Sequence, residues 1–262
     1  MGHERIGYLP KSKKWRDIVD EVANFTANGD TIAQIANQTT KNVIDRYDNI
    51  EADNGVLAAF KFLILLSQSA RQKNSSEFLA KQGIQLPTNF NLLGLSRAIR
   101  EFIYTNSESK EYSAFANHAL IETVSQWTKQ NQVQQQIQFD SDNNSFDEWR
   151  SAADGSGFCE LSRMFFSNFT DNYLRYFLER EASAKINNLF DRDTFNKKLD
   201  EHVNEISKLA FETSKITQSF SAGWFNKNAM DEIPSNEKIK GFVSFCFKKL
   251  NSEIIREKEF EK

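Results

Sequence analysis

Side chains that commonly hold metals or act as nucleophiles are few in this chain and widely spaced. There are three histidines, His3, His118 and His202, and two cysteines, Cys159 and Cys246. A zinc site needs about four N, S or O ligands, typically as short paired spacings, and no such pair occurs here. We therefore expect no metal, cofactor or catalytic residue among them. His118 and His202 are interpreted as structural residues on helices, and Cys159 as a small apolar side chain rather than a nucleophile.

Two further segments resemble ligand-binding loops only in part. The segment 140–144 begins like a calcium-binding loop, but the sixth position should be Gly and is Ser145, and the twelfth should be Glu and is Ser151. Gly155 and Gly157 do not make a dinucleotide-binding fingerprint, because no third glycine follows and no strand is predicted before them. The first segment is therefore interpreted as a solvated acidic loop and the second as a break between helices.

Positive charge is concentrated near the N-terminus, at Lys11, Lys13, Lys14 and Arg16. Such a cluster can contact nucleic-acid phosphates or an acidic partner. The favoured interpretation is a helix start exposed to solvent. Because positive charge at a helix N-terminus is mildly unfavourable against the helix dipole, binding of nucleic acid or an acidic partner stays as the alternative.

Two large aromatic residues, Trp224 and Phe225, follow a glycine in the segment 221–234, which is predicted to be a loop. Exposed aromatic side chains are frequent anchors of protein interfaces. We therefore predict that Trp224, Phe225 and Lys227 contact a protein partner. An equally weighted alternative is that both rings fold under the loop as a small apolar cluster.

The composition predicts a mainly α-helical protein. Only 10 glycines and 3 prolines occur in 262 residues, whereas an all-β fold needs many tight turns. The 23 phenylalanines lie mostly at helical spacing beside other apolar residues, so they are expected to form the core. The net charge of −3 excludes a general basic field for binding nucleic acid. We predict a bundle of about eight to ten helices.

Apolar residues recur at the helical period along most of the chain. The block from Val56 to about Arg71 is apolar on more than one face, which is typical of a central helix. A polar stretch, 48–55, leads into it. The helical period covers about 12–28, 31–47, 56–71, 76–81, 91–104, 107–127, 158–169, 171–185, 194–217 and 235–254.

The composition changes near the middle of the chain. Residues 131–150 are rich in Gln, Asn and Asp and have few apolar anchors. We predict a linker or exposed loop there, which would divide the chain into helical subdomains at 1–130 and 151–262. Alternatively, the preceding helix continues through the glutamine run, because Gln is a fair helix former.

Several features indicate a cytoplasmic protein with no membrane contact. The first fifteen residues lack the apolar core of a secretory signal. No run approaches the 18 apolar residues of a membrane span. Two distant cysteines fit a reducing compartment better than a disulfide scaffold.

Two segments, Phe166–Ser183 (FSNFTDNYLRYFLEREAS) and Ser221–Lys227 (SAGWFNK), resemble accessory proteins encoded in bacterial anti-phage defence operons. The resemblance implies a bacterial cytoplasmic protein that acts with partner subunits, and it carries over no catalytic motif. The expected function is therefore a non-catalytic helical subunit or adaptor that works through protein–protein contacts. A nucleic-acid-binding protein using the N-terminal basic cluster and an enzyme of an unrecognised helical class are the alternatives.

Overall fold

The structure is a computed structural model that describes residues 12–29, 31–107, 112–135, 145–211 and 220–256. As predicted, the fold is a multi-helix bundle. The described residues form eleven α-helices, two short 3₁₀ helices and no strand. The elements are α1 (Lys13–Ala23), α2 (Ile32–Val43), η1 (Ile44–Arg46), α3 (Tyr47–Ala52), α4 (Asn54–Ser69), α5 (Ser75–Lys81), α6 (Leu92–Asn106), α7 (Ser113–Gln135), η2 (Asp147–Ala153), α8 (Gly155–Lys185), α9 (Leu189–Phe211), α10 (Phe220–Asn228) and α11 (Asn236–Arg256).

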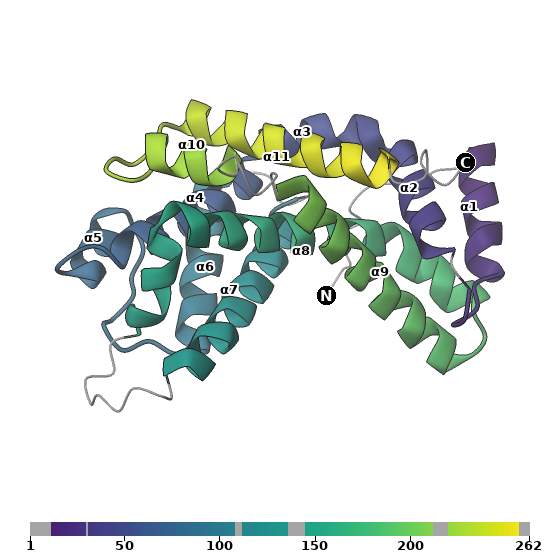
Figure 1. The fold of residues 1–262 in the computed structure, drawn as a ribbon, viewed down its shortest axis with the longest axis horizontal. Coiled ribbons are helices and arrows are strands. Elements are labelled where there is room, and N and C mark those ends of the chain that lie inside the picture. Colours follow the sequence, from purple (N-terminus) through teal and green to yellow (C-terminus); the bar gives the residue numbers. More distant parts are fainter. Residues whose placement is uncertain (1–11, 30, 108–111, 136–144, 212–219, 257–262) are drawn as a thin grey trace.

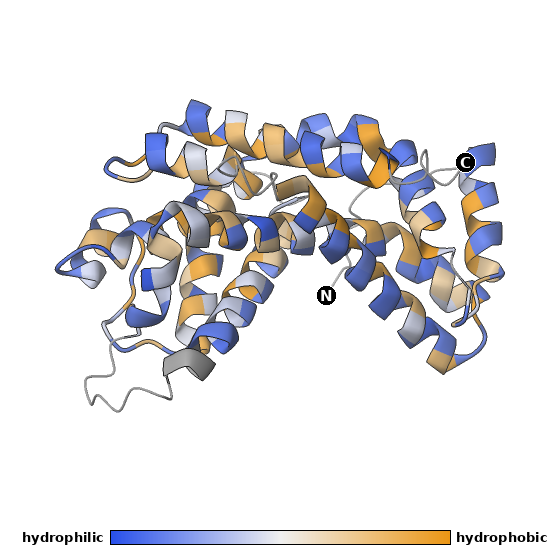
Figure 2. Cartoon of the chain, viewed as in Figure 1, coloured by the Kyte–Doolittle hydropathy of each residue, from blue (hydrophilic) through white to orange (hydrophobic). Residues whose placement is uncertain are grey.

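The long helix α8 is the centre of the architecture. It packs against α7, α9, α10, α1 and η2, and every residue from 161 to 171 is buried. Figure 1 shows α10, α11 and α3 along one edge of the molecule, while α7 and α9 diverge from one another on the other edge. Figure 2 shows the hydrophobic residues gathered where the helices meet. Helix α8 thus links two groups of helices that spread apart below it.

The core is built from phenylalanine rings, as the composition predicts. Phe60 on α4 has ring centroids 5.3–6.0 Å from Phe158, Phe165, Phe166 and Phe242. Offset and edge-to-face ring pairs add stabilisation beyond the area that they bury. One continuous hydrophobic cluster runs through both halves of the chain, so α4, α8 and α11 share the same core.

The predicted linker at 131–150 is helical at both of its ends. Helix α7 continues to Gln135, as the alternative interpretation proposed, and η2 begins at Asp147. Trp149 in η2 is completely buried and stacks on Trp127, with ring centroids 6.3 Å apart. Residues 136–144, including the segment that begins like a calcium loop, lie outside the described part of the chain.

Two short helices were not predicted from the sequence. The stretch 48–55 contains α3 and the start of α4, whose first turn is capped by Asp53 accepting from the amides of Gly55 and Val56. The predicted loop at 221–234 is α10 over most of its length. The prediction of a loop at 221–234 was wrong, and α3 was not predicted, because a short helix can be held by tertiary packing even where its own periodicity is weak. None of the described helices is long and apolar enough to cross a bilayer.

Candidate functional site: a polar groove between α7, α8 and α9

The predicted aromatic contact is largely part of the core. Phe225 is completely buried and its ring stacks on Phe158 at 4.3 Å between centroids. Trp224 is half-buried and lies 4.4 Å from the ring of Phe242. The ring of Phe225 is therefore packed inside the molecule, as the alternative interpretation proposed, and the segment that carries it is a helix rather than a loop. Lys227 is exposed on α10.

The predicted basic cluster lies on α1, apart from the groove described below. Lys13, Lys14 and Arg16 are exposed there, while Lys11 lies outside the described residues. Asp17 and Asp20 are exposed on the same short helix. The described part of this surface therefore carries both signs of charge.

The structure does not bring the remaining candidates together. His118 is exposed and lies 3.6 Å from Glu122, whereas His202 and Cys246 are buried in other places. Cys159 is half-buried, and His3 lies outside the described part of the chain. Within that part, no three His, Cys, Asp or Glu side chains are placed to hold a metal ion.

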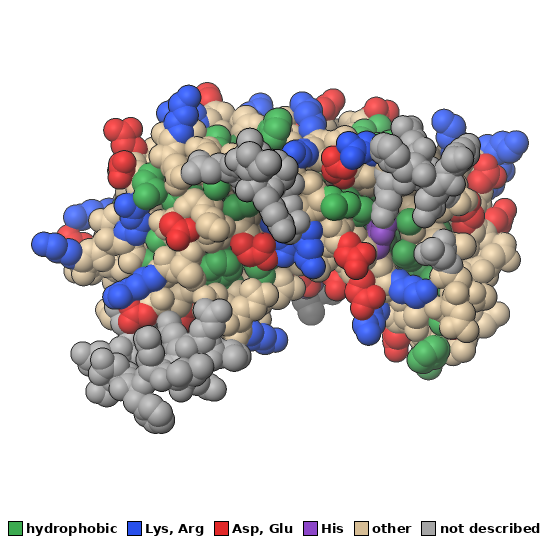
Figure 3. Space-filling model, viewed as in Figure 1, with side chains coloured by type: hydrophobic (Ala, Val, Ile, Leu, Met, Phe, Trp, Pro, Cys, Tyr) green, Lys and Arg blue, Asp and Glu red, His purple; other side chains and the backbone are tan. Residues whose placement is uncertain are grey.

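The structure instead shows a polar pocket of about 370 Å³ where α7, α8 and α9 meet. Figure 3 shows basic and acidic side chains next to each other along the notch between the two groups of helices. The floor comes from α8, which presents its polar side between two diverging neighbours. The lining residues are Gln126, Gln130, Glu160, Arg163, Met164, Ser167, Asn168, Asp200, Asn204 and Lys208.

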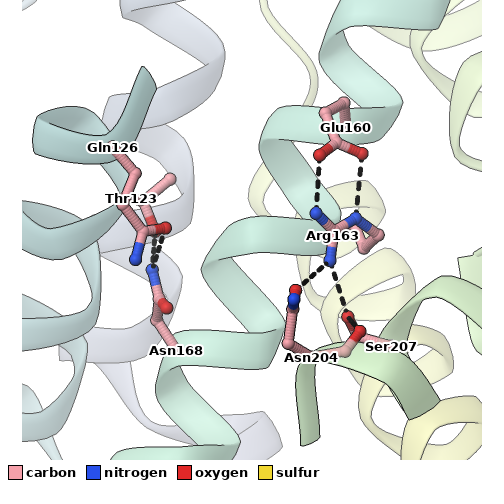
Figure 4. A network of polar contacts seen from close by, with 7 residues as sticks. All are labelled: Thr123, Gln126, Glu160, Arg163, Asn168, Asn204 and Ser207. Atoms are coloured by element: carbon pink, nitrogen blue, oxygen red, sulfur yellow. Dashed lines mark hydrogen bonds and ion pairs between the residues drawn. The ribbon is translucent and has the colours of Figure 1, made fainter. Parts of the chain in front are cut away.

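Arg163 fixes one wall of this groove. Its guanidinium donates to both carboxylate oxygens of Glu160, at 2.8 and 2.6 Å, to the side-chain oxygen of Asn204 at 2.7 Å and to Ser207 at 2.8 Å. Arg163 is only 7% exposed, and four of its five N–H donors are satisfied by these bonds. The network ties α8 to α9, as Figure 4 shows, and holds the wall in one arrangement.

A second network fixes the opposite wall. The side-chain amide of Asn168 on α8 donates to Thr123 at 3.0 Å and to Gln126 at 3.3 Å, both on α7. Thr123 in turn donates to the backbone oxygen of Ala119 at 2.7 Å. Figure 4 shows the two networks on either side of the groove. The polar groups of the groove are therefore oriented before any ligand arrives.

Asp171 is buried on α8 next to the groove. It lies one turn along α8 from Asn168, pairs with Arg175 at 2.7 Å and is 94% buried by the fold. Desolvation raises the pKa of Asp171 to about 7, while Arg175 opposes the rise and Asp200 and Glu122 add to it. Glu122 on α7 accepts from Asn172 at 2.8 Å. Of the carboxyl groups of Glu122, Asp171 and Asp200, only that of Asp200 lines the pocket.

We expect the stability of the fold to fall between pH 5 and pH 8 because of Asp171. Its carboxyl stays protonated in the folded state up to about pH 7 but ionises near 3.8 when unfolded. Unfolding therefore releases a proton over this range, and stability decreases as the pH rises. The expected loss is about 2–3 kcal/mol, from the linkage relation and a pKa difference of this size.

The matched variant is Asp171→Asn, which cannot ionise. Urea denaturation at pH 5 and pH 8 should show that the unfolding free energy of the variant gains about 2–3 kcal/mol on that of the wild type between the two pH values. Arg175 has no ionised partner in the variant at either pH, and in the wild type it gains one only as Asp171 ionises. That gain is already contained in the pKa of about 7. An unchanged difference between the two proteins at both pH values would contradict a raised pKa.

Comparisons with known proteins give no relative from which a function can be carried over, since no family model, no curated protein and no solved structure matches this chain. The groove itself is the best guide to activity. Glu160 and Arg163 are held in an internal pair, and the arginine is almost saturated with hydrogen bonds, whereas Asp200 and Lys208 are exposed at the groove. This arrangement suits recognition of a polar surface better than chemistry on a small substrate.

The groove residues are not among the site residues predicted from the sequence, although a signal for them exists. Along α8, polar residues recur three or four positions apart inside an apolar helix: Glu160, Arg163, Ser167, Asp171 and Arg175. A polar stripe on a helix that is otherwise buried marks a face that meets polar neighbours rather than the core. The partner positions on α7 and α9 cannot be read from this stripe.

Proposed function

We propose that this chain is a non-catalytic helical subunit or adaptor that binds a partner protein in the polar groove between α7, α8 and α9. The observation that carries the proposal is the pair of internal networks that orient the groove walls. Preorganised polar groups lower the entropic cost of binding. The bacterial, cytoplasmic and anti-phage setting rests on the sequence resemblance alone.

The partner contact proposed here differs from the aromatic contact expected from the sequence. Phe225 is buried, whereas Gln126, Asp200 and Lys208 are exposed at the groove. A rigid polar concavity with exposed charges at its rim is typical of non-obligate interfaces, which are about as polar as the rest of a protein surface. The groove can therefore hold a partner without any rearrangement of the core.

The test is affinity capture from the source cells with the wild type and two matched variants. The groove variant combines Gln126→Lys with Asp200→Lys. The control combines Gln85→Lys with Glu205→Lys, which makes the same change in charge at exposed positions outside the groove. We expect the wild type and the control to retain a stoichiometric protein partner. The amount of partner captured by the groove variant should be at least tenfold lower.

Two outcomes would count against the groove. Equal retention by the groove variant would remove it as the binding site. If a Trp224→Ala variant loses the partner while the groove variant retains it, the partner binds at α10 instead. Circular dichroism of each variant confirms that the helices are intact before the comparison is made.

A further inference from the structure

The hydrogen-bond networks determine which half of each groove amide is left for a ligand. Thr123 uses its hydroxyl hydrogen on Ala119, so it can only accept from Asn168. Asn168 must therefore point its NH₂ group towards Thr123 and Gln126. Both hydrogens of that NH₂ group are then engaged. Its side-chain oxygen is left as an acceptor, and the NH₂ group of Gln126 is left as a donor.

The opposite wall is fixed by the same reasoning. Arg163 can only donate hydrogen bonds, so Asn204 must present its side-chain oxygen to the guanidinium. The NH₂ group of Asn204 is left as a donor. Across the groove, from α7 to α9, the three amides thus offer a donor at Gln126, an acceptor at Asn168 and a donor at Asn204.

We infer that the ligand of this groove is an extended polypeptide segment of the partner, recognised through its backbone. This inference rests on the proposed function. An extended chain that lies in the groove parallel to α9 presents carbonyl groups on both of its edges. Its backbone can therefore accept from Gln126 on the α7 wall and from Asn204 on the α9 wall. Side-chain amides carry the same donor and acceptor groups as a peptide bond. They can therefore take the place of a neighbouring strand.

The charges along α9 define which side chains the segment should carry. Asp200, Asn204 and Lys208 line the groove at intervals of one helical turn. Eight residues of helix span about 12 Å, which an extended chain covers in about four residues at roughly 3.3 Å each. Residues four apart in an extended chain face the same side. The matching segment carries a basic residue and an acidic residue four positions apart.

The two exposed charges on α9 give the motif its direction. A lysine or arginine of the segment meets Asp200 at one end of the groove. At the other end, Lys208 meets the acidic residue, while Glu160 is already held by Arg163. The lining has two carboxylates, Glu160 and Asp200, and two cations, Arg163 and Lys208, so it offers no net positive charge to the phosphates of a nucleic-acid strand.

The test uses synthetic peptides titrated into ¹⁵N-labelled full-length protein and followed by NMR. The first peptide is acetyl-GSSKSASESSG-amide, with Lys and Glu four apart. A second replaces the Glu by Lys, a third replaces both charged residues by Ser, and a fourth replaces the central Ala by Pro, which removes one backbone N–H. An oligo(dT) of about twelve nucleotides serves as the nucleic-acid probe.

In the wild type, the Lys–Glu peptide should shift the side-chain NH₂ signals of Gln126 and Asn204. It should bind about three- to fivefold more tightly than the Lys–Lys peptide, the size of one partly exposed ion pair. The variant Lys208→Glu should reverse this preference, and the exposed control Lys185→Glu should keep it. The Pro and Ser peptides should bind more weakly than the Lys–Glu peptide in the wild type.

Other results overturn the inference in ways that separate it from the proposed function. If no peptide shifts the groove signals at millimolar concentration but partner capture depends on the groove, the partner binds there as a folded surface. If capture is also independent of the groove, both proposals fall. Shifts of the groove signals by oligo(dT) alone would replace the polypeptide by a nucleic-acid strand.

Discussion

Replacing Gly157 by alanine will destabilise the fold by about 3 kcal/mol, because an added Cβ has no space. Gly157 lies in the first turn of α8, where its amide donates to the capping carboxylate of Asp154 at 2.8 Å. A Cβ there would overlap the backbone carbonyl of Ser151 in η2. Since neither backbone can move without breaking the cap or displacing η2, the clash cannot be relieved by a side-chain rotation.

The matched control is Gly241→Ala, at an exposed position in α11 where an added Cβ meets no atom within 4 Å. Alanine at this helical position should stabilise the protein by about 0.5–1 kcal/mol. If η2 approaches α8 as closely as described, chemical denaturation will give changes in unfolding free energy of opposite sign for the two variants. Similar small effects in both variants would show that η2 is not held against the start of α8.

Much of the fold can be predicted from the sequence, because the spacing of apolar residues within a helix indicates which of its faces is buried. Apolar spacing and the scarcity of glycine and proline place most of the helices. What fails is the prediction of short helices such as α3 and α10, whose stability comes from contacts with distant segments. The close approach of η2 to Gly157 cannot be predicted either, since the sequence indicates a helix break there but not which backbone lies against it.

The candidate site could be predicted less well than the fold. The polar stripe on α8 is visible in the sequence, but Gln126 and Asn204 are ordinary exposed or half-buried polar residues of amphipathic helices. Only the packing of α7 and α9 against α8 makes them face Asn168 and Arg163. Conversely, Trp224 and Phe225 attracted attention by residue type, although their packing places them against the core.

Replacing Phe166 by alanine should cost about 4 kcal/mol, the usual range for a buried phenylalanine. Its side chain is completely buried. Its ring lies 4.9–6.4 Å, between centroids, from rings that come from α4, α8, α9 and α11: Phe60, Phe165, Phe211, Phe242 and Phe247. Removing it leaves a cavity between four helices, and ring contacts between them are lost with no replacement.

Phe245 provides the comparison, because it is on α11 but 51% exposed. Phe245→Ala should cost less than about 1 kcal/mol, since little buried area is lost. The position of Phe166 also links stability to the groove, because Ser167 and Asn168 follow it directly on α8 and line the pocket. We therefore expect Phe166→Ala to lower the melting temperature and to weaken binding in the groove together, whereas Phe245→Ala changes neither. A stable Phe166→Ala protein would mean that the aromatic core does not position the groove.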